Sequence, residues 1–358
     1  MSVETQDKGG AGTSASGTAT ASSKARLPAD VAILVFLRDR GIFVLWAILL
    51  ILFSIWNHPY FASVPNAILI VAAASLTAIF AASVAIGLLS GALDLSVPGV
   101  AALCSCLAGA MIEKWGFSVP VSLIAALAFG GLCGLINGRI VLSGLNPLVV
   151  TIGTLSVTGG LAAVVAGGYA ISGLSELQFM GSARYFGLPS HAYIVAIVYS
   201  GMTIFLSFTR TGIRLRAVGG NAEAVRRAGI SANRYQLYGF ILSAMLAALG
   251  GLMSTALVTQ ATPTANPAVL FTALTAVFLA GVSLRGGRGS LPRVLIGALI
   301  LATISNALTI AGVQPYWATI TTGVLMIAAL AFDKYLTEAI SARLVKISNA
   351  TVHGSVKQ

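Results

Sequence analysis

The chain has 358 residues, of which 57% are hydrophobic and only 9% charged, and its formal net charge is +11 at pH 7. A soluble domain carries about 25% charged residues to cover its surface. The deficit excludes an ordinary soluble protein and indicates that most of the outer surface faces lipid. Excess Lys and Arg are also found in nucleic-acid-binding proteins, but cytoplasmic loops of membrane proteins collect the same residues. We therefore expect contact with membrane lipid and no nucleic acid.

The two ends of the chain differ from its middle. Residues 1–30 are rich in Ser, Ala, Gly and Thr and have no apolar core, so they form neither a signal peptide nor a span. With few large apolar groups this tract cannot offset the entropy of ordering, and we predict a disordered cytoplasmic tail. Residues 31–335 form the predicted membrane domain, and residues 336–358 a cytoplasmic C-terminal tail.

Ten apolar runs predict an all-α, polytopic transmembrane bundle, since about 20 apolar residues in a helix cross the bilayer core. The runs cover residues 41–56, 66–89, 97–112, 118–136, 147–166, 190–208, 235–258, 268–284, 294–311 and 316–332. The fifth run contains Gly153, Gly159 and Gly160 and is compatible with either a complete span or a re-entrant helix.

The distribution of charge supports this topology. With the N-terminus in the cytoplasm and ten crossings, 19 of the 21 Lys and Arg residues lie inside, and only Lys114 and Arg184 lie outside. Membrane proteins retain positively charged loops in the cytoplasm. Loss of one span in the middle would place the loop 209–234 or the loop 285–293 outside. The sequence therefore predicts ten spans with both ends in the cytoplasm.

An internal repeat relates two distant parts of the chain. Residues 76–84 (LTAIFAASV) resemble residues 274–282 (LTAVFLAGV), and each is followed by a Ser-apolar-Pro-x-Val element, at 96–100 and 290–294. Proline is well placed in the first turn of a helix. We therefore predict that spans 2 and 3 are repeated as spans 8 and 9, and transporters often carry their pathway at the interface of such repeats.

The segment 209–234 is too polar to enter the bilayer and carries six arginines against Glu223. Asn221 is a suitable helix N-cap, Glu223 lies in the first turn, and Gly229 is a stop signal. Arg226 and Arg227 follow near the C-terminal end, as the helix dipole favours. A short helix between two spans suits docking to a cytoplasmic partner. A solvated basic loop beside anionic lipid is the alternative.

Asp94 is the only carboxylate in the apolar region 41–112. An acid within a membrane domain is a functional hypothesis by default, because burying it unpaired costs several kcal/mol. Its surroundings, residues 91–96, predict a helix break and restart. Two roles remain open: a cap for the third span through backbone N–H groups, or a place in the transport pathway or its gate.

Several strings then resemble a known family in the same order over about residues 60–335. The string TRTGIRLRAVGGNAEAVRRAGI has Glu and Gly six apart, which resembles the coupling-loop motif of ABC importer permeases. GALDLSVPGVAAL, NPLVVTIGTLSVTGGLAAVVAGG and LRGGRGSLPRVLIGALIL are similar to segments of the ribose/xylose/galactose-type permeases. The chain departs from the family pattern at Ala92, Leu93 and Val225, so a substrate assignment cannot be carried over.

The resemblance implies the permease subunit of an ABC importer for a monosaccharide or related polyol in the bacterial cytoplasmic membrane. The implied partners are a cytoplasmic ATPase subunit, a periplasmic binding protein and a second permease copy. The residues implied in ATPase coupling are Gly219, Gly220, Asn221, Glu223, Ala224, Arg226, Arg227 and Gly229. The chain has no GxxxxGK[ST] motif, so ATP and Mg are expected in the partner, with no cofactor and no catalytic residue here.

A sugar pathway needs partners for hydroxyl groups without strong charge. The candidates in apolar surroundings are Asn137, Asn146, Thr151, Thr154, Thr275, Asn306 and Trp317. Asp94 and Ser96 are further candidates for the pathway or its gate. Most polar residues in spans bond across helices instead, so only two or three are expected to line a cavity. The three cysteines, Cys104, Cys106 and Cys133, have no His or acidic neighbours and are expected to pack rather than to bind a metal.

Two other functions are alternatives. The same architecture serves importers of other small polar solutes, such as nucleosides or branched-chain amino acids. A stand-alone secondary transporter usually needs several intramembrane acids or histidines. This chain offers Asp94, while His58 and His191 lie at the edges of spans and His353 in the tail. The secondary transporter is therefore the weaker alternative.

Overall fold

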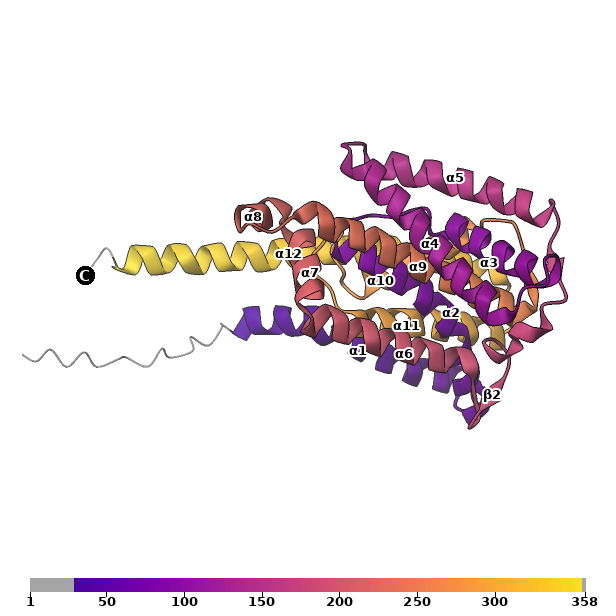
Figure 1. Ribbon diagram of the computed structural model, residues 1–358. Helices are drawn as coiled ribbons and strands as arrows, with labels where there is room; N and C mark the ends of the chain where they lie inside the picture. The colour runs from indigo at the N-terminus through magenta and orange to yellow at the C-terminus, as the bar shows by residue number, and fades with distance from the viewer. Residues whose placement is uncertain (1–28, 356–358) are drawn as a thin grey trace, which may run out of the picture.

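The computed structural model describes residues 29–355, and it is a bundle of α-helices with only short strands at one end (Figure 1). Most of the predicted N-terminal tail and residues 356–358 lie outside the described residues. The membrane helices and segments are α1 (Ala29–Trp56), α2 (Val64–Leu89), α3 (Val97–Glu113), α4 (Val119–Leu142), α5 (Pro147–Ala166), α6 (Ser190–Phe208), α9 (Ala232–Val258), α10 (Pro267–Leu279), α11 (Leu291–Ile310) and α12 (Pro315–Ser355).

Seven of the described helices are long and apolar enough to cross a membrane. They are α2, α4, α5, α6, α9, α11 and the first part of α12, Pro315–Tyr335. Three shorter apolar helices are Arg40–Trp56 within α1, α3 and α10. Each predicted apolar run overlaps one of these helices, so the chain is a polytopic helical membrane protein. Helix α10 ends at Leu279, earlier than the predicted residue 284, because Gly281 turns the chain with a φ of +70°.

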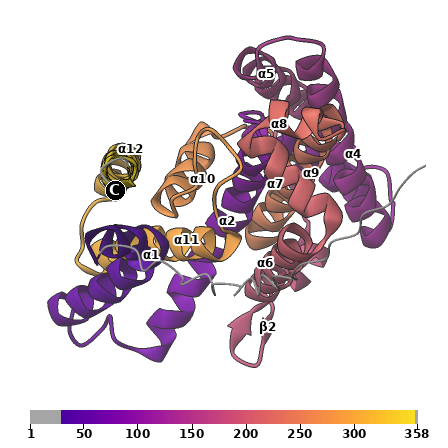
Figure 2. The same ribbon diagram turned by 90° about the vertical axis from the view of Figure 1, so that its left-hand side faces the viewer.

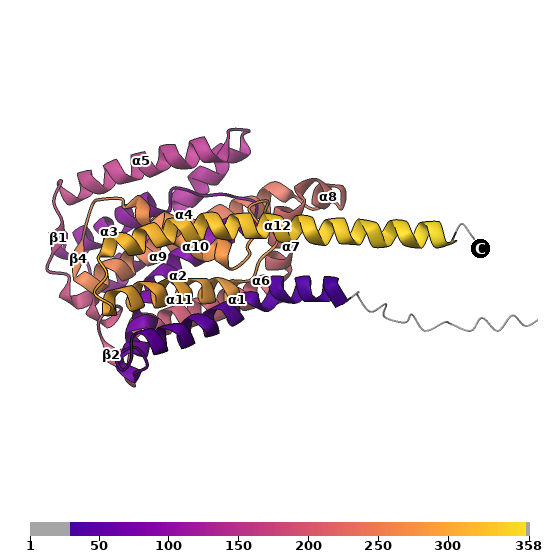
Figure 3. The same cartoon turned by 180° about the vertical axis from the view of Figure 1, so that it is seen from behind.

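Two features of the helices settle questions that the sequence left open. The fifth helix, α5, runs without a break from Pro147 to Ala166, through all three of its glycines. Helix α12 continues past the membrane domain to Ser355, so the described part of the predicted C-terminal tail is helical. In Figures 1 and 3 this part of α12 projects beyond the bundle.

The two ends of the bundle have different contents. Helices α7 (Arg210–Gly220) and α8 (Ala222–Arg227) lie at the end from which α12 projects and at which α1 begins (Figures 1 and 3). At the opposite end, β1 (Ile171–Ser172) pairs antiparallel with β4 (Gln260–Ala261). The hairpin of β2 (Arg184–Tyr185) and β3 (Leu188–Pro189) and the 3-10 helix η1 (Ser175–Phe179) belong to the same end.

Helices α2 and α9 form the centre of the bundle. In an apolar 18-residue stretch of each helix, 56% of α2 and 61% of α9 is buried. The same buried share is 17% for α5 and 6% for Pro315–Tyr335 of α12. Seen from the α8 end, α10 and α12 lie on one side of α2 and α9, and α4 and α5 on the other (Figure 2). The outer helices expose large apolar side chains, such as Ile152, Val164 and Ile327, as a lipid-facing surface requires.

Glycines allow the central helices to approach one another closely. A β-carbon at Gly134 of α4 would lie 2.8 Å from Cβ of Ala244 in α9 and would overlap the Phe240 carbonyl oxygen. A β-carbon at Gly251 of α9 would overlap the Ala101 carbonyl of α3. In lipid, the hydrophobic effect does not drive helices together, because the lipid tails are as apolar as the side chains. Helices associate instead through such close packing of small residues. These glycine faces are therefore used for packing within the chain.

We expect Gly134→Ala to destabilise the protein, because the new methyl group must push α4 away from α9. Overpacking of this kind costs about 1–3 kcal/mol, which exceeds the gain of about 1 kcal/mol in helix propensity. The matched control is Gly160→Ala, since a β-carbon at Gly160 meets no atom within 4 Å. Thermal unfolding of the detergent-solubilised protein should show a lower midpoint for Gly134→Ala only. Equal midpoints for the two variants would contradict this packing.

Candidate functional site

The candidate coupling site is an elbow of two short helices between α6 and α9. Thr209 ends α6 and caps α7, since its hydroxyl accepts a hydrogen bond from the Gly212 amide at 3.0 Å. Asn221 then caps α8 by accepting from the Ala224 amide at 3.0 Å. Gly229, with a φ of +76°, donates its N–H to the Arg226 carbonyl at 2.9 Å and ends the turn. The predicted short helix and its cap are therefore confirmed.

The charged side chains of α8 remain available to a partner. Glu223 contacts Arg226 at 3.4 Å and Arg227 at 3.3 Å, and all three are more than half exposed. Exposed ion pairs contribute at most about 1 kcal/mol each, so the caps rather than these pairs hold the helix. No residue of α8 is buried.

The elbow is anchored on its inner side. Val218, Ala232 and Tyr235 form a small buried cluster against which Val225 and Ile230 pack. The Arg214 guanidinium donates a hydrogen bond to the Tyr235 hydroxyl at 3.0 Å, which ties α7 to the start of α9. The outer face of α8 is thus open, while the inner side of the elbow is attached to the membrane helices.

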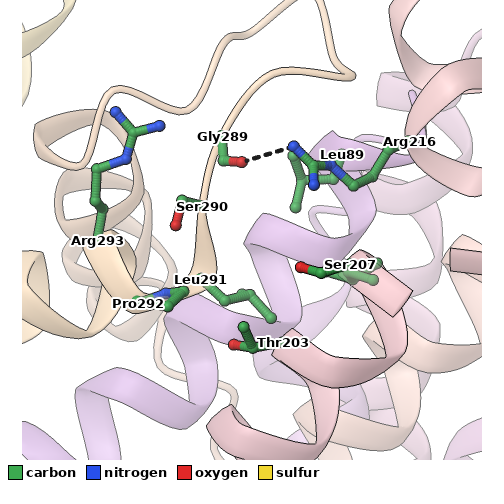
Figure 4. A pocket seen from close by; sticks show the side chains of 10 residues that line it. Leu89, Thr203, Ser207, Arg216, Gly289, Ser290, Leu291, Pro292 and Arg293 are labelled. Atoms are coloured by element: carbon green, nitrogen blue, oxygen red, sulfur yellow. Dashed lines mark hydrogen bonds between the residues drawn. The ribbon is translucent and has the colours of Figure 1, made fainter. Parts of the chain in front are cut away.

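A cavity of about 240 Å³ lies behind α7, between α6, the end of α2 and the start of α11 (Figure 4). Thr203 and Ser207 line it from α6. The Arg216 guanidinium spans part of it and donates a hydrogen bond to the Gly289 carbonyl at 3.3 Å. This bond joins the coupling elbow to the segment before α11, a connection that the sequence did not reveal.

A buried polar network lies in the first connector, residues 90–96, which joins α2 to α3. Asp94 is only 2% exposed, and its Oδ1 accepts hydrogen bonds from the Ser96 amide at 2.9 Å and the Ser96 hydroxyl at 2.5 Å. Asn137 of α4 donates to the Ser96 hydroxyl at 3.0 Å. Thr154 of α5 donates to Asn137 Oδ1 at 2.6 Å. Four of the predicted residues, from three parts of the chain, are therefore brought together.

The network holds the restart of the helix in place. Asp94 lies just before α3 and accepts a hydrogen bond from the amide of Ser96, which is the N-cap of α3. The second carboxylate oxygen, Oδ2, is buried and has no hydrogen-bond partner among the described residues. Burial raises the pKa of the Asp94 carboxyl, against the lowering effect of the hydrogen bonds from Ser96.

The remaining predicted residues are separated from this network. Thr151 and Thr275 are buried and donate to carbonyls one turn earlier in their own helices, at 2.8 Å and 2.7 Å. Asn146 is exposed and caps α5 by accepting from the Leu148 amide at 2.9 Å. Trp317 is 51% exposed. These contacts give each residue a structural place and leave its role in a pathway a prediction.

Asn306 belongs to a second polar contact that the sequence did not reveal. Its amide nitrogen donates to Asn66 Oδ1 at 2.9 Å, while Asn66 donates to the Phe61 carbonyl at 2.9 Å. The Asn306 Oδ1 atom is buried without a partner in the described chain. Nothing in the sequence indicated that Asn66 contacts Asn306, because Asn66 follows a Ser-Val-Pro helix start and resembles an ordinary residue of the first turn.

The part of the chain that the structure describes has no group of three His, Cys, Asp or Glu side chains placed to hold a metal. The three cysteines are buried and unbridged. They contribute to packing, since Cys104 and Cys133 lie in the main hydrophobic cluster.

Comparison with known proteins now identifies the family. Residues 66–330 match the family model described as "Branched-chain amino acid transport system / permease component". The chain belongs to this permease family. It is 32% identical to the ribose import permease protein RbsC of Haemophilus influenzae, over 84% of this chain and 94% of that protein. No solved structure matches the chain.

Two further relatives import other sugars by name. The chain is 30% identical to the fructose import permease protein FrcC of Rhizobium meliloti, over 80% of this chain and 82% of that protein. It is 32% identical to the L-arabinose transport system permease protein AraH of Escherichia coli, over 84% of this chain and 91% of that protein. The chain is therefore a multi-pass permease component of the bacterial inner membrane, and the resemblance inferred from the motifs is confirmed.

We expect Asp94→Ala to lower both stability and transport, because it leaves the buried Ser96 hydroxyl without its acceptor. A buried polar group left without its partner costs about 1–3 kcal/mol. Asp94→Asn keeps an acceptor oxygen of the same shape and carries no charge, so it should stay close to the native protein. Purified yield, the unfolding midpoint and solute uptake measure these effects. If Asp94→Ala leaves all three unchanged, Asp94 neither caps α3 nor belongs to a gate.

Proposed function

We propose that this permease is the membrane subunit of an ABC importer that carries a monosaccharide or related polyol, driven by a separate ATPase. The observation that carries the proposal is the capped helix α8 at one end of the bundle, which has no buried residue and lies in the segment with the Glu-x5-Gly coupling motif. The relatives named above import ribose, fructose and arabinose, three different monosaccharides. The substrate class follows from this agreement.

A separate ATPase subunit is the partner that fits α8. The sequence contains no GxxxxGK[ST] phosphate-binding loop, so in this proposal ATP is hydrolysed by another chain. ATP and Mg then bind to that chain and not to this one. A short helix with an open outer face and an anchored inner side suits a groove on such a partner.

The proposed topology has ten spans and both ends in the cytoplasm. In this topology each of the seven long apolar helices and each of the three shorter ones crosses the membrane once. The elbow 209–234 and the ends of the described chain lie at the same end of the bundle (Figure 1). With this orientation, 19 of the 21 Lys and Arg residues lie in the cytoplasm.

A periplasmic binding protein and a second permease copy complete the proposed assembly. The segments that would meet the binding protein are residues 57–65 and 167–189, at the end opposite α8. Two ATPase subunits require two coupling elbows, and a second copy of this chain supplies the other. Lipid covers the exposed apolar side chains of the outer helices.

A second candidate substrate class is a branched-chain amino acid, because the description of the family model names branched-chain amino-acid transport. The two classes are separated by the ligand that the partner binding protein retains. Uptake of a labelled monosaccharide that an excess of unlabelled leucine does not inhibit supports the sugar. Uptake of labelled leucine that an excess of unlabelled monosaccharide does not inhibit would support the amino acid.

We expect Glu223→Ala to reduce the amount of ATPase that co-purifies with the permease by about tenfold. Loss of one important contact at an interface costs more than about 1 kcal/mol, and about 1.4 kcal/mol corresponds to a tenfold change in affinity. The control is Glu176→Ala, which removes an exposed glutamate of η1, in the connection between α5 and α6. Equal ATPase recovery for the two variants would contradict the coupling role. Full uptake by cells without the ATPase would contradict the importer.

The topology can be tested with single cysteines, because the three native cysteines are buried. We expect Arg184→Cys to react in intact cells (outer membrane permeabilised) with a maleimide that cannot cross the inner membrane. Arg210→Cys, which is also exposed in the structure, should react only after the cells are opened. The reverse pattern, or reaction of both in intact cells, would overturn the orientation.

A further inference from the structure

The last turn of α7 lies where two connectors of the bundle meet. The first connector, residues 90–96, follows α2, and the second connector, residues 280–290, follows α10. A β-carbon built on Gly219 would overlap the Leu89 carbonyl oxygen on one side and lie 2.9 Å from the Gly287 amide nitrogen on the other. Gly219 is therefore held between both segments, with backbone facing backbone.

The glycines of the connectors complete this contact. A β-carbon on Gly286 would lie 2.5 Å from the Gly219 carbonyl oxygen and 2.9 Å from that of Leu88. One on Gly91 would lie 3.3 Å from Cα of Gly219. We call residues 88–91, 219–220 and 286–289 the glycine junction. Its parts come from three distant regions of the sequence.

The second connector is itself a fixed turn rather than a slack loop. Ser283 donates its N–H to the Arg288 carbonyl at 3.0 Å, and Gly286 donates to the Ser283 carbonyl at 3.0 Å. Gly286 and Gly287 have φ values of +86° and +69°, which favour glycine. The hydrogen bond from Arg216 to the Gly289 carbonyl adds a side-chain tie between α7 and this turn (Figure 4).

The two connectors are also the ones that the sequence repeat relates. Residues 76–84 precede the first connector and residues 274–282 run into the second, and a Ser-apolar-Pro-x-Val element begins the helix after each. If spans 2 and 3 are repeated as spans 8 and 9, as the sequence predicts, α7 contacts both repeats at equivalent points. Transporters commonly move one repeat against another.

We propose that the glycine junction transmits movement of the coupling elbow to both repeats at once, with Gly219 as the positioning residue. Close-packed backbone cannot absorb a displacement by changing side-chain rotamers, because it has no side chains to rearrange. Movement of α8 against the ATPase therefore reaches α2 and the start of α11 through α7. This inference rests on the proposed coupling to an ATPase and adds the route within the permease.

The test uses the permease assembled with its ATPase and binding protein in liposomes. We expect Gly219→Ala to lower substrate uptake per ATP hydrolysed by about tenfold or more, a barrier change of about 1.4 kcal/mol. The control is Gly201→Ala on the neighbouring helix α6, where a β-carbon meets no atom within 4 Å. Uptake per ATP hydrolysed that is equal in the two variants overturns the proposal.

A second pair of variants covers the case in which Gly219→Ala does not assemble. Arg216→Gln removes the tie to Gly289 without adding bulk, and Arg210→Gln makes the same charge change at an exposed position of α7. We expect only Arg216→Gln to reduce uptake per ATP hydrolysed. Equal uptake per ATP hydrolysed in these two variants overturns the proposal as well. Failure of the native permease to retain any ATPase would instead refute the proposed function.

Discussion

Close backbone approach at glycine is the constraint on which this structure depends. In lipid, burial of apolar side chains adds little to helix association, because the tails are as apolar as the residues. Helices gain contact only by fitting surfaces together, and Gly134 and Gly251 let α4 and α3 come within backbone distance of α9. The same device joins the coupling elbow to the membrane helices through Gly219. Packing and coupling therefore share one physical basis.

Polar groups inside the bundle obey a second constraint, since each must find a partner without water. Most hydroxyls in the spans meet it locally, as Thr151 and Thr275 do by donating to a carbonyl one turn earlier. Asp94 meets it at one oxygen, since Oδ1 accepts from Ser96 and Oδ2 has no partner among the described residues. Asn137 and Thr154 then extend the chain of hydrogen bonds from Ser96 to other helices. This network fastens the restart of the chain at α3 to both α4 and α5. The connector after α2 is thus rigid on its membrane side and in contact with α7 on the other.

The coupling elbow combines two helices with opposite surroundings. Helix α8 has no buried residue and owes its form to the Asn221 cap and the Gly229 turn. Helix α7 has Leu215, Val218 and Gly219 buried against the bundle. An exposed helix can meet a partner, and a buried one can carry the resulting movement inward. The close succession of the two, separated only by Asn221, suits the conversion of a binding event into a displacement of the membrane helices.

The sequence by itself determined the membrane class, the positions of ten apolar helices and the capped helix at Asn221, because hydropathy and capping are local properties. It also identified the permease family through ordered motifs. Only the tertiary structure decided which polar residues meet: Asp94, Ser96, Asn137 and Thr154 come together, while Asn146 caps its own helix. It alone placed Gly219 between the two connectors. The reason is that such contacts join residues far apart in the chain, and small residues leave no sequence signal for the neighbour that they admit.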